Sequence, residues 1–237
     1  MITKKIILIS ILCQLSCHVN AQFLRGIGIF IGLTESSHRY INKLPVDSAF
    51  MHTYDAPSHR SAEFFSWSVG FLGEFLKYDK FRWQTEIEFC NKGAVERPLL
   101  DRYTGERGPV SANTYGNIQW NNFAKFFFNE GYRGTPYIMI GARIEYNLMR
   151  TITAYAPVAG AVPKINFTPD VSLGYEFVSY SKFKPFVELH YNPDLLKLHV
   201  GNVDMWNRTL ELRVGIIFRP KKDLDNCNAP KYKGKSY

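Results

Sequence analysis

The sequence predicts an all-β protein, an eight-stranded antiparallel up-and-down transmembrane β-barrel that follows a signal peptide. Three observations lead to this prediction. Apolar and polar residues alternate with a period of two in nearly every patterned stretch, which is the period of a strand with two different faces. The connections between these stretches are alternately long and short, as in outer-membrane barrels. The N-terminus has the composition of an export signal.

Residues 1–21 have the order of a secretory signal peptide. A short basic stretch precedes an apolar run at residues 6–12, and the small-residue sequence that ends at Ala21 predicts cleavage there. The apolar run is shorter than the roughly 20 residues that a transmembrane helix needs. Lipoprotein processing at Cys13 or Cys17 is the alternative.

Cleavage would remove two lysines and lower the formal net charge from +8 to +6. Cys90 and Cys227 would remain, far apart in the chain, so no disulfide framework is predicted. Phosphate loops, Cys-x-x-Cys pairs and nucleophile elbows are absent from the sequence, and we expect no cofactor and no metal. An exported basic protein rarely meets nucleic acid, so the expected partners are outer-membrane lipid and lipopolysaccharide.

The first four predicted strands lie in the N-terminal half of the barrel domain, residues 22–218. Residues 27–33 alternate isoleucine or leucine with glycine, and residues 64–77 alternate aromatic residues with serine, glycine and glutamate. Residues 80–90 separate most cleanly, with aromatic and aliphatic side chains on one face and charged ones on the other. The pattern of residues 115–128 is the weakest because a polar asparagine interrupts its apolar face.

The second four predicted strands follow the same rule. Residues 137–149 alternate aliphatic side chains with glycine, arginine, glutamate and asparagine. Residues 170–177 and 184–191 set aliphatic residues and tyrosine against acidic residues and histidine, and residues 209–218 repeat the pattern with glutamate and arginine. Several of the eight segments reach the nine to eleven residues of a membrane-spanning strand.

The connections predict the orientation of the barrel. The long ones lie near residues 35–60, 91–114, 151–164 and 193–207, and the short ones near residues 78–80, 129–134 and 180–183. Short periplasmic turns and long outer loops are typical of outer-membrane barrels, so both termini are expected in the periplasm. The alternative is a soluble β-sandwich or a lipocalin-like barrel, which would turn the apolar faces into a core.

The polar faces predict a charged lumen. Eight strands enclose a space that side chains fill, and buried charges must pair because an unpaired one costs several kcal/mol. We therefore expect a network that closes the lumen, with Glu74 bound to Arg82 and the surplus carboxylates protonated, hydrated or matched by Lys80, Lys125 or His190. A proton or cation path is the alternative. The expected network residues are Glu74, Arg82, Glu86, Glu88, Arg143, Glu145, Asp170, Glu176, Glu188, His190, Glu211 and Arg213.

The apolar faces are rich in aromatic residues, which form 15% of the chain. Aromatic side chains concentrate at the two interfaces of a membrane barrel. The residues expected on the lipid face and in these girdles are Trp67, Phe71, Trp83, Phe89, Trp120, Tyr146, Tyr175 and Phe218.

Two stretches resemble a known family. Residues 115–149 contain an aromatic-rich strand, the turn Asn129-Glu130-Gly131 and a strand that opens with Pro-Tyr-Ile. Residues 170–192 contain a Gly-Tyr-Glu strand and a second strand that closes in Tyr-Asn. These motifs resemble the PorT-like outer-membrane β-barrel family of Bacteroidetes-type envelopes. The resemblance implies a barrel in the outer membrane, and a few members of the family belong to protein-secretion machinery.

The expected function is therefore a non-enzymatic barrel, structural or accessory to an outer-membrane complex, with contacts through its outer loops or a basic flexible tail, residues 219–237. The tail is otherwise a candidate docking segment for a periplasmic partner. The alternative function is a narrow pore or a lipid- or solute-modifying enzyme with a site at the outer rim. The candidate rim residues are His38, Ser48, His52, Asp55 and His59.

Overall fold

The computed structural model describes residues 24–43, 60–76, 78, 80–96, 110–128, 133–153, 159–179, 181–193, 198–200 and 203–220. The predicted signal peptide and the tail beyond Pro220 lie outside these residues. In the described ranges, no helix is long and apolar enough to cross a membrane. The strands are β1 (Leu24–Asn42), β2 (Phe64–Phe75), β3 (Phe81–Glu96), β4 (Ser111–Phe127), β5 (Gly134–Thr151), β6 (Ile165–Phe177), β7 (Phe183–Pro193), β8 (Leu198–Val200) and β9 (Val203–Phe218).

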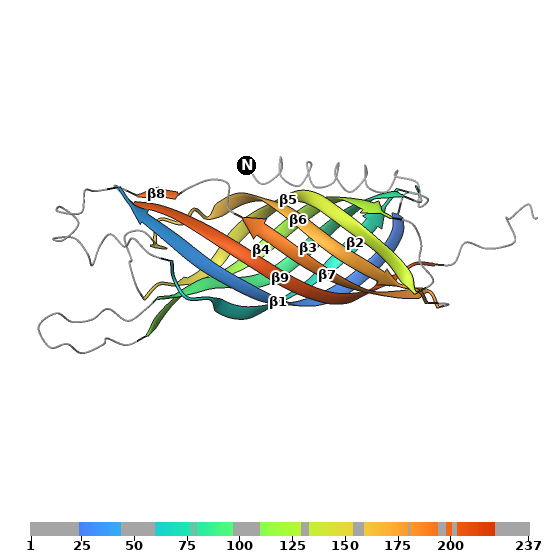
Figure 1. Ribbon diagram of the computed structural model, residues 1–237, viewed down its shortest axis with the longest axis horizontal. Helices are drawn as coiled ribbons and strands as arrows, with labels where there is room; N and C mark the ends of the chain where they lie inside the picture. The colour runs from blue at the N-terminus through green and yellow to red at the C-terminus, as the bar shows by residue number, and fades with distance from the viewer. Residues whose placement is uncertain are drawn as a thin grey trace, which may run out of the picture.

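The strands form one antiparallel sheet that closes on itself (Figure 1). Neighbours in the ring follow the chain from β1 to β7, then β9, and β9 pairs with β1 from Ile27↔Phe218 to Asn42↔Val203. The short strand β8 pairs with residues 203–205 of β9. The other edge of these residues pairs with β1, so β8 lies on the edge of β9 that β7 occupies farther along the strand. The up-and-down topology was predicted correctly, but the structure has nine strands rather than eight. A three-residue strand is too short to show a two-residue period, so β8 was expected to be part of a loop.

Most strands are longer than their apolar patterns. The isoleucine–glycine alternation of β1 ends at Leu33, but the strand continues to Asn42. In this extension, the outward residues Glu35 and Arg39 are polar, and the inward residues make the stabilising contacts. The hydroxyl of Ser36, for example, donates to the carbonyl oxygen of Gly93 at 2.8 Å. An apolar pattern therefore marks only part of each strand.

The connections divide between the two ends of the barrel. Short connections at residues 76–80, 128–133 and 178–182 lie at the end where β1 begins and β9 ends. The strands are joined at their opposite ends by the long connections, residues 43–63, 97–110, 152–164 and 194–202, the last of which contains β8. Those ends of the strands lie together at the other end of the barrel (Figure 1). The predicted alternation of long and short connections is confirmed.

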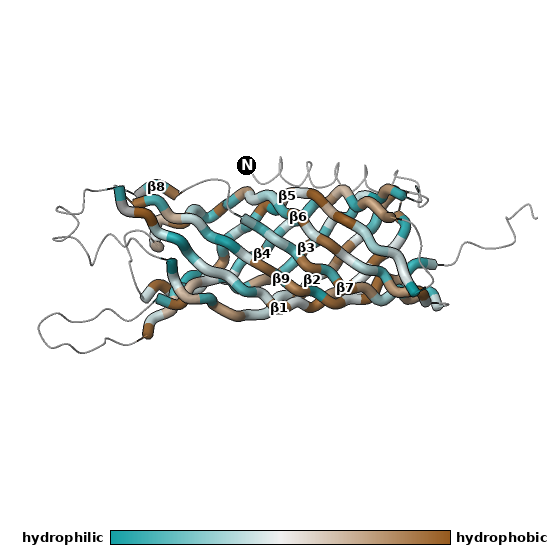
Figure 2. The backbone as a smooth tube through the Cα atoms, in the orientation of Figure 1, coloured by the Kyte–Doolittle hydropathy of each residue, from teal (hydrophilic) through white to brown (hydrophobic). Residues whose placement is uncertain are grey.

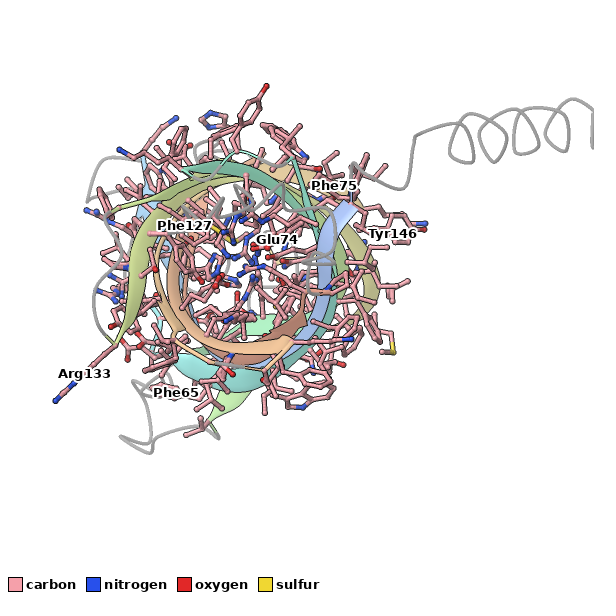
Figure 3. All side chains as sticks on the ribbon, turned by 90° about the vertical axis from the view of Figure 1, so that its right-hand side faces the viewer. Phe65, Glu74, Phe75, Phe127, Arg133 and Tyr146 are labelled. Carbon is pink, nitrogen blue, oxygen red and sulfur yellow. The ribbon has the colours of Figure 1, made fainter. Side chains whose placement is uncertain are left out.

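Hydrophobic and hydrophilic residues alternate along the strands (Figure 2), and the burial of their side chains shows that the two faces of the wall differ in polarity. Outward aliphatic and aromatic side chains are exposed, as in Ile31 at 62% and Phe71 at 69%, whereas the inward Arg143 and Arg213 have no exposed area. Figure 3 shows Glu74 inside the ring and Phe65 and Tyr146 outside it. We call the outward apolar surface the apolar belt; on β1 it extends from Ile27 to Leu33. A soluble barrel has the opposite arrangement.

Two small apolar clusters also lie in the lumen. One contains Phe30, Leu72, Phe186 and Ile217, and the other Phe123, Phe127, Tyr137 and Met139. Glycines in the wall make room for these rings. A Cβ atom on Gly174 would lie 2.2 Å from the Tyr137 ring, and one on Gly70 would lie 2.4 Å from Phe30. The lumen is therefore filled by aromatic rings as well as by charged groups.

Candidate functional site: the charged lumen

The centre of the lumen is an ion cluster built by three strands. Arg213 on β9 reaches Glu86 and Glu88 on β3, with N–O distances of 2.8 and 2.5 Å, and its own strand neighbour Glu211 at 2.8 Å. Arg143 on β5 also reaches Glu211, at 3.2 Å. Because β3, β5 and β9 contribute side chains to one cluster, the charges bridge the barrel from wall to wall.

A second cluster lies toward the end with the short connections. Glu74 forms ion pairs with Arg82, Lys125 and Arg219, at N–O distances of 3.4, 3.1 and 2.7 Å. Arg219 also donates two hydrogen bonds to Glu176. These contacts join β2, β3, β4 and β6 to the residue that follows β9, and they close this end of the lumen.

His190 lies between the two clusters. One ring nitrogen is 3.0 Å from a carboxylate oxygen of Asp170, and the other is 3.1 Å from Glu188. An imidazole that faces an ionised carboxylate at each nitrogen donates from both, which requires two ring protons. Asp170 also contacts Arg143 at 2.5 Å, and Glu188 accepts a hydrogen bond from the Tyr137 hydroxyl at 2.7 Å. His190 therefore serves as a further cation in the network.

The end with the long connections is polar but carries fewer charges. Lys92 donates to Glu145 and to the Asn192 side chain. Beyond the apolar belt, the Tyr40 hydroxyl donates to Glu96 at 2.8 Å and lies 3.1 Å from the His38 ring. Burial lowers the pKa of His38 to about 4, partly opposed by Glu96, and raises the pKa of Tyr40. His38 is therefore uncharged at neutral pH.

The structure places all twelve residues of the expected network in the lumen, each buried. The predicted pair Glu74–Arg82 is present; Lys125 pairs with Glu74 and Glu188, and His190 contacts Asp170. Lys80 is exposed and takes no part. Sequence reasoning missed Lys92, which lies beyond the predicted end of its strand. It also placed Arg219 in the flexible tail, although this side chain closes one end of the lumen.

The two-residue period of the strands could have identified both cations that the sequence analysis did not assign to the lumen. Lys92 has the same parity as Glu86 and Glu88 on β3, and Arg219 has the same parity as Glu211 and Arg213 on β9. Side chains with the same parity lie on the same face of a strand. Extending the two-residue period past the apolar pattern would therefore have assigned both residues to the lumen.

The eight aromatic residues expected on the lipid face all belong to the outward face. Trp67, Phe71, Trp83, Trp120 and Tyr146 are 41–69% exposed. Phe89, Tyr175 and Phe218 are half-buried because each packs against a neighbouring outward ring, respectively Trp67, Phe177 and Phe183.

The candidate rim site is only partly described. Ser48, His52, Asp55 and His59 lie outside the described residues. His38 is buried and faces the lumen, where its ring contacts Tyr40. In the described part of the chain, no group of three or more histidine, cysteine, aspartate or glutamate residues is arranged to hold a metal ion.

Comparison with known proteins gives structural matches alone. No family model matches the chain, and no curated protein matches it. The outer membrane protein OprG from Pseudomonas aeruginosa is similar over 84% of this chain and 98% of its own, with 10% identity and a TM-score of 0.51. Neisserial surface protein A is similar over 81% of this chain and 97% of its own, with 11% identity and a TM-score of 0.43. The similarity to OprG agrees with the closed antiparallel β-barrel described above.

Proposed function

We propose that this chain is a non-enzymatic outer-membrane β-barrel protein with a closed lumen, which acts as a structural or accessory subunit of an outer-membrane complex. The single observation that carries the proposal is the reversed polarity of the wall. Charged residues fill the interior, and aliphatic and aromatic residues cover the exterior. Such a protein is stable where its exterior contacts lipid.

The apolar belt is too large for a soluble monomer. On β1 alone, the outward side chains of Ile27, Ile29, Ile31 and Leu33 are 54–68% exposed, and the neighbouring strands continue the same surface. Soluble monomers rarely expose contiguous apolar patches larger than a few hundred Å². The neighbouring structure OprG is described as an outer membrane protein, which agrees with this location. We place the end with the short connections, and so both ends of the barrel domain, in the periplasm.

The lumen network supports a closed barrel rather than a pore. Arg143, Arg213, Glu74 and Lys125 have no exposed area, and ion pairs cross the interior between opposite strands. A conducting pore needs a continuous path of water, whereas an eight-stranded barrel has an interior that side chains fill. The carboxylates are engaged in holding the cations, which also supports a role other than acid–base catalysis.

The subunit role is supported by the strands that continue beyond the apolar belt and by the resemblance to the PorT-like family. The strands β1 and β3 continue beyond the apolar belt to Asn42 and Glu96. Copurification from native membranes tests this role. We expect a stoichiometric partner that is lost when residues 44–59 or residues 221–237 are deleted. Isolation of the intact chain alone would contradict it.

Membrane insertion and lumen closure have separate tests. The folded barrel should fractionate with the outer membrane and migrate differently in gel electrophoresis before and after boiling. Recovery in the soluble periplasmic fraction would refute the location. In planar bilayers, the purified protein should give no sustained current, and stable single-channel conductance would favour the narrow pore instead.

A further inference from the structure

Three arginines lie on the outward face of the barrel, at the end with the long connections. Arg39 on β1 and Arg60, in the connection before β2, form an antiparallel bridge, and residues that are directly opposite point to the same face. Arg208 on β9 has the parity of the outward residues of that strand. The side chains of Arg60 and Arg208 are 47% and 43% exposed, and Arg39 is exposed as well. We call these three residues the outer arginine site.

The positive charges of this site repel one another. Arg39 and Arg60 are directly opposite, and like charges in this position destabilise a pair of strands. In the described part of the chain, no carboxylate lies within ion-pair distance of Arg39. An anion that contacts both arginines would remove the repulsion between them.

The carboxylates near the site do not balance its charge. Two glutamates each contact one arginine, at N–O distances of 3.3 and 3.9 Å; they are Glu63 with Arg60 and Glu35 with Arg208. Exposed pairs of this kind contribute about 1 kcal/mol or less, so a stronger anion can displace them. Asp204 on β9 belongs to the same face, but it is paired with Lys43 at 2.9 Å.

The three arginines line a pocket of about 1000 Å³. The lining combines cations, a hydroxyl group and aromatic rings, from Ser37, Arg39, Arg60, Tyr191, Trp206 and Arg208. Pockets that bind small ligands have volumes of about 300–1,000 Å³. The pocket is therefore large enough for a phosphorylated sugar, whereas a bare phosphate ion would fill only a small part of it.

The site lies directly beyond the apolar belt. Leu210 of β9 and Tyr191 of β7 pair with each other and are 37% and 46% exposed. Arg208 is two residues beyond Leu210, and Trp206, which is opposite Arg39, is four residues beyond it, or about 7 and 13 Å along the strand. A strand tilt of about 40° reduces these lengths to heights of about 5 and 10 Å. Because a head-group layer is about 5–7 Å thick, the site begins within that layer.

We propose that the outer arginine site binds the phosphorylated sugar head group of a glycolipid in the outer leaflet. A phosphate lies between Arg39 and Arg60, the sugar occupies the pocket beside Trp206, and the acyl chains lie along the apolar belt. Guanidinium groups suit this ligand because they bind phosphate oxygens through two parallel hydrogen bonds. A phosphate monoester carries about 1.5 to 2 negative charges near pH 7, so it balances the cations better than the single charge of a phosphodiester. This inference rests on the proposed membrane location and orientation.

Native mass spectrometry tests the site. The full-length mature protein is folded in a neutral detergent and titrated with lipid A, a disaccharide lipid that carries two phosphate monoesters. We expect one tightly bound lipid A per chain. Lipid A without its phosphates and phosphatidylglycerol should each bind at least tenfold more weakly, and inorganic phosphate at the concentration of lipid A should not compete. Equally tight binding of phosphatidylglycerol, or displacement of lipid A by inorganic phosphate, would overturn the choice of a phosphorylated glycolipid.

A double variant tests the residues. Arg39→Gln with Arg60→Gln should weaken the binding of lipid A at least tenfold. Arg25→Gln with Arg133→Gln is the matched control, because it removes the same charge at the end with the short connections, where Arg133 points away from the ring (Figure 3). The control should change the affinity less than twofold.

Urea unfolding distinguishes a lost ligand contact from a lost structural contact. In phosphatidylcholine vesicles without lipid A, the Arg39→Gln, Arg60→Gln variant should unfold at the same or a higher urea concentration than the wild type, because the repulsion is removed. Lipid A should raise the urea midpoint of the wild type, since a ligand that binds the folded state stabilises it, and should leave the midpoint of the variant unchanged. An equal loss of stability in the variant with and without lipid A would refute the site.

The outcomes separate this inference from the proposed function. A protein that fails to enter vesicles, judged by unchanged electrophoretic mobility on boiling, refutes the membrane location. A protein that inserts but binds lipid A no more tightly than dephosphorylated lipid A refutes the site alone. Equal loss of lipid A binding in the two double variants also refutes the site, because the effect would then come from net charge.

Discussion

Removing Arg213 should destabilise the barrel more than any change at an exposed arginine. Its guanidinium is fully buried and lies within 2.8 Å of three carboxylates, those of Glu86, Glu88 and Glu211. Breaking a buried ion pair by removing one partner costs about 3–5 kcal/mol, because the other charge is left uncompensated. Arg213→Met keeps much of the side-chain length and leaves three carboxylates close together. We expect the free energy of unfolding to fall by about 4 kcal/mol.

The assay is equilibrium unfolding in urea, followed by tryptophan fluorescence in phospholipid vesicles. With a denaturant slope of about 2 kcal/mol/M, the midpoint should shift by about 2 M. Arg208→Met is the matched control on the same strand. Its side chain is 43% exposed, and its nearest carboxylate, that of Glu35, is 3.9 Å away. An exposed pair of this kind contributes about 1 kcal/mol or less.

A double variant tests the cause. Adding Glu88→Gln to Arg213→Met removes one of the uncompensated carboxylates, so it should restore at least about 1 kcal/mol relative to the single variant. The reasoning is refuted if Arg213→Met costs no more than Arg208→Met. That result would mean that water solvates the carboxylates of the central cluster, and the lumen would then be hydrated rather than closed.

Three further predictions concern the wall, the end of the barrel with the long connections and the end with the short connections. Gly174→Ala should lower the free energy of unfolding by about 1–3 kcal/mol, because its Cβ would lie 2.2 Å from the Tyr137 ring. The control in the same urea assay is Gly116→Ala, which should be close to neutral because its Cβ would lie 3.2 Å from the nearest atom. The pKa of His38 is about 4 in the folded chain against 6.5 when exposed, so its stabilising contribution is complete above pH 6.5 and is lost as the pH falls toward 4. This loss is about 3 kcal/mol, and it should disappear from the pH dependence of the urea midpoint in His38→Gln; equal pH dependence in both proteins would contradict it. Arg219→Met should lower thermal stability while deletion of residues 221–237 should not, and equal melting temperatures for the two variants would show that the Arg219 contacts with Glu74 do not stabilise the barrel.

The sequence predicted the topology because each spanning strand has two chemically different faces. In β3, for instance, the alternation of Trp83 and Ile87 with Glu86 and Glu88 identifies both the strand and the direction of its side chains. This alternation can be recognised from residues that are neighbours in the sequence. The lumen residues could therefore be assigned from parity, without knowledge of which strands would meet across the barrel.

The remaining features depend on contacts between distant residues. Which carboxylate Arg213 binds follows from the register of the whole ring, and no local pattern reports that register. The extension of β1 to Asn42 was missed because its stability comes from inward contacts such as Tyr40 with Glu96 rather than from apolar alternation. The point at which the β6–β7 pairing ends, Val171↔Tyr191, depends on both strands, and no local pattern in either strand reports it.

The ion pairs of β9 also constrain the order in which the barrel can fold. Arg213 is 127 and 125 residues away from its partners Glu86 and Glu88, and Arg219 is 145 residues away from Glu74. β9 is the last strand of the ring to be synthesised, so β3 has to keep these carboxylates in water until β9 arrives. Contacts at such separation form late because loop closure must precede them. Closing the ring and removing water from its interior are therefore one event, and a chain that stops before β9 should remain an open, hydrated sheet.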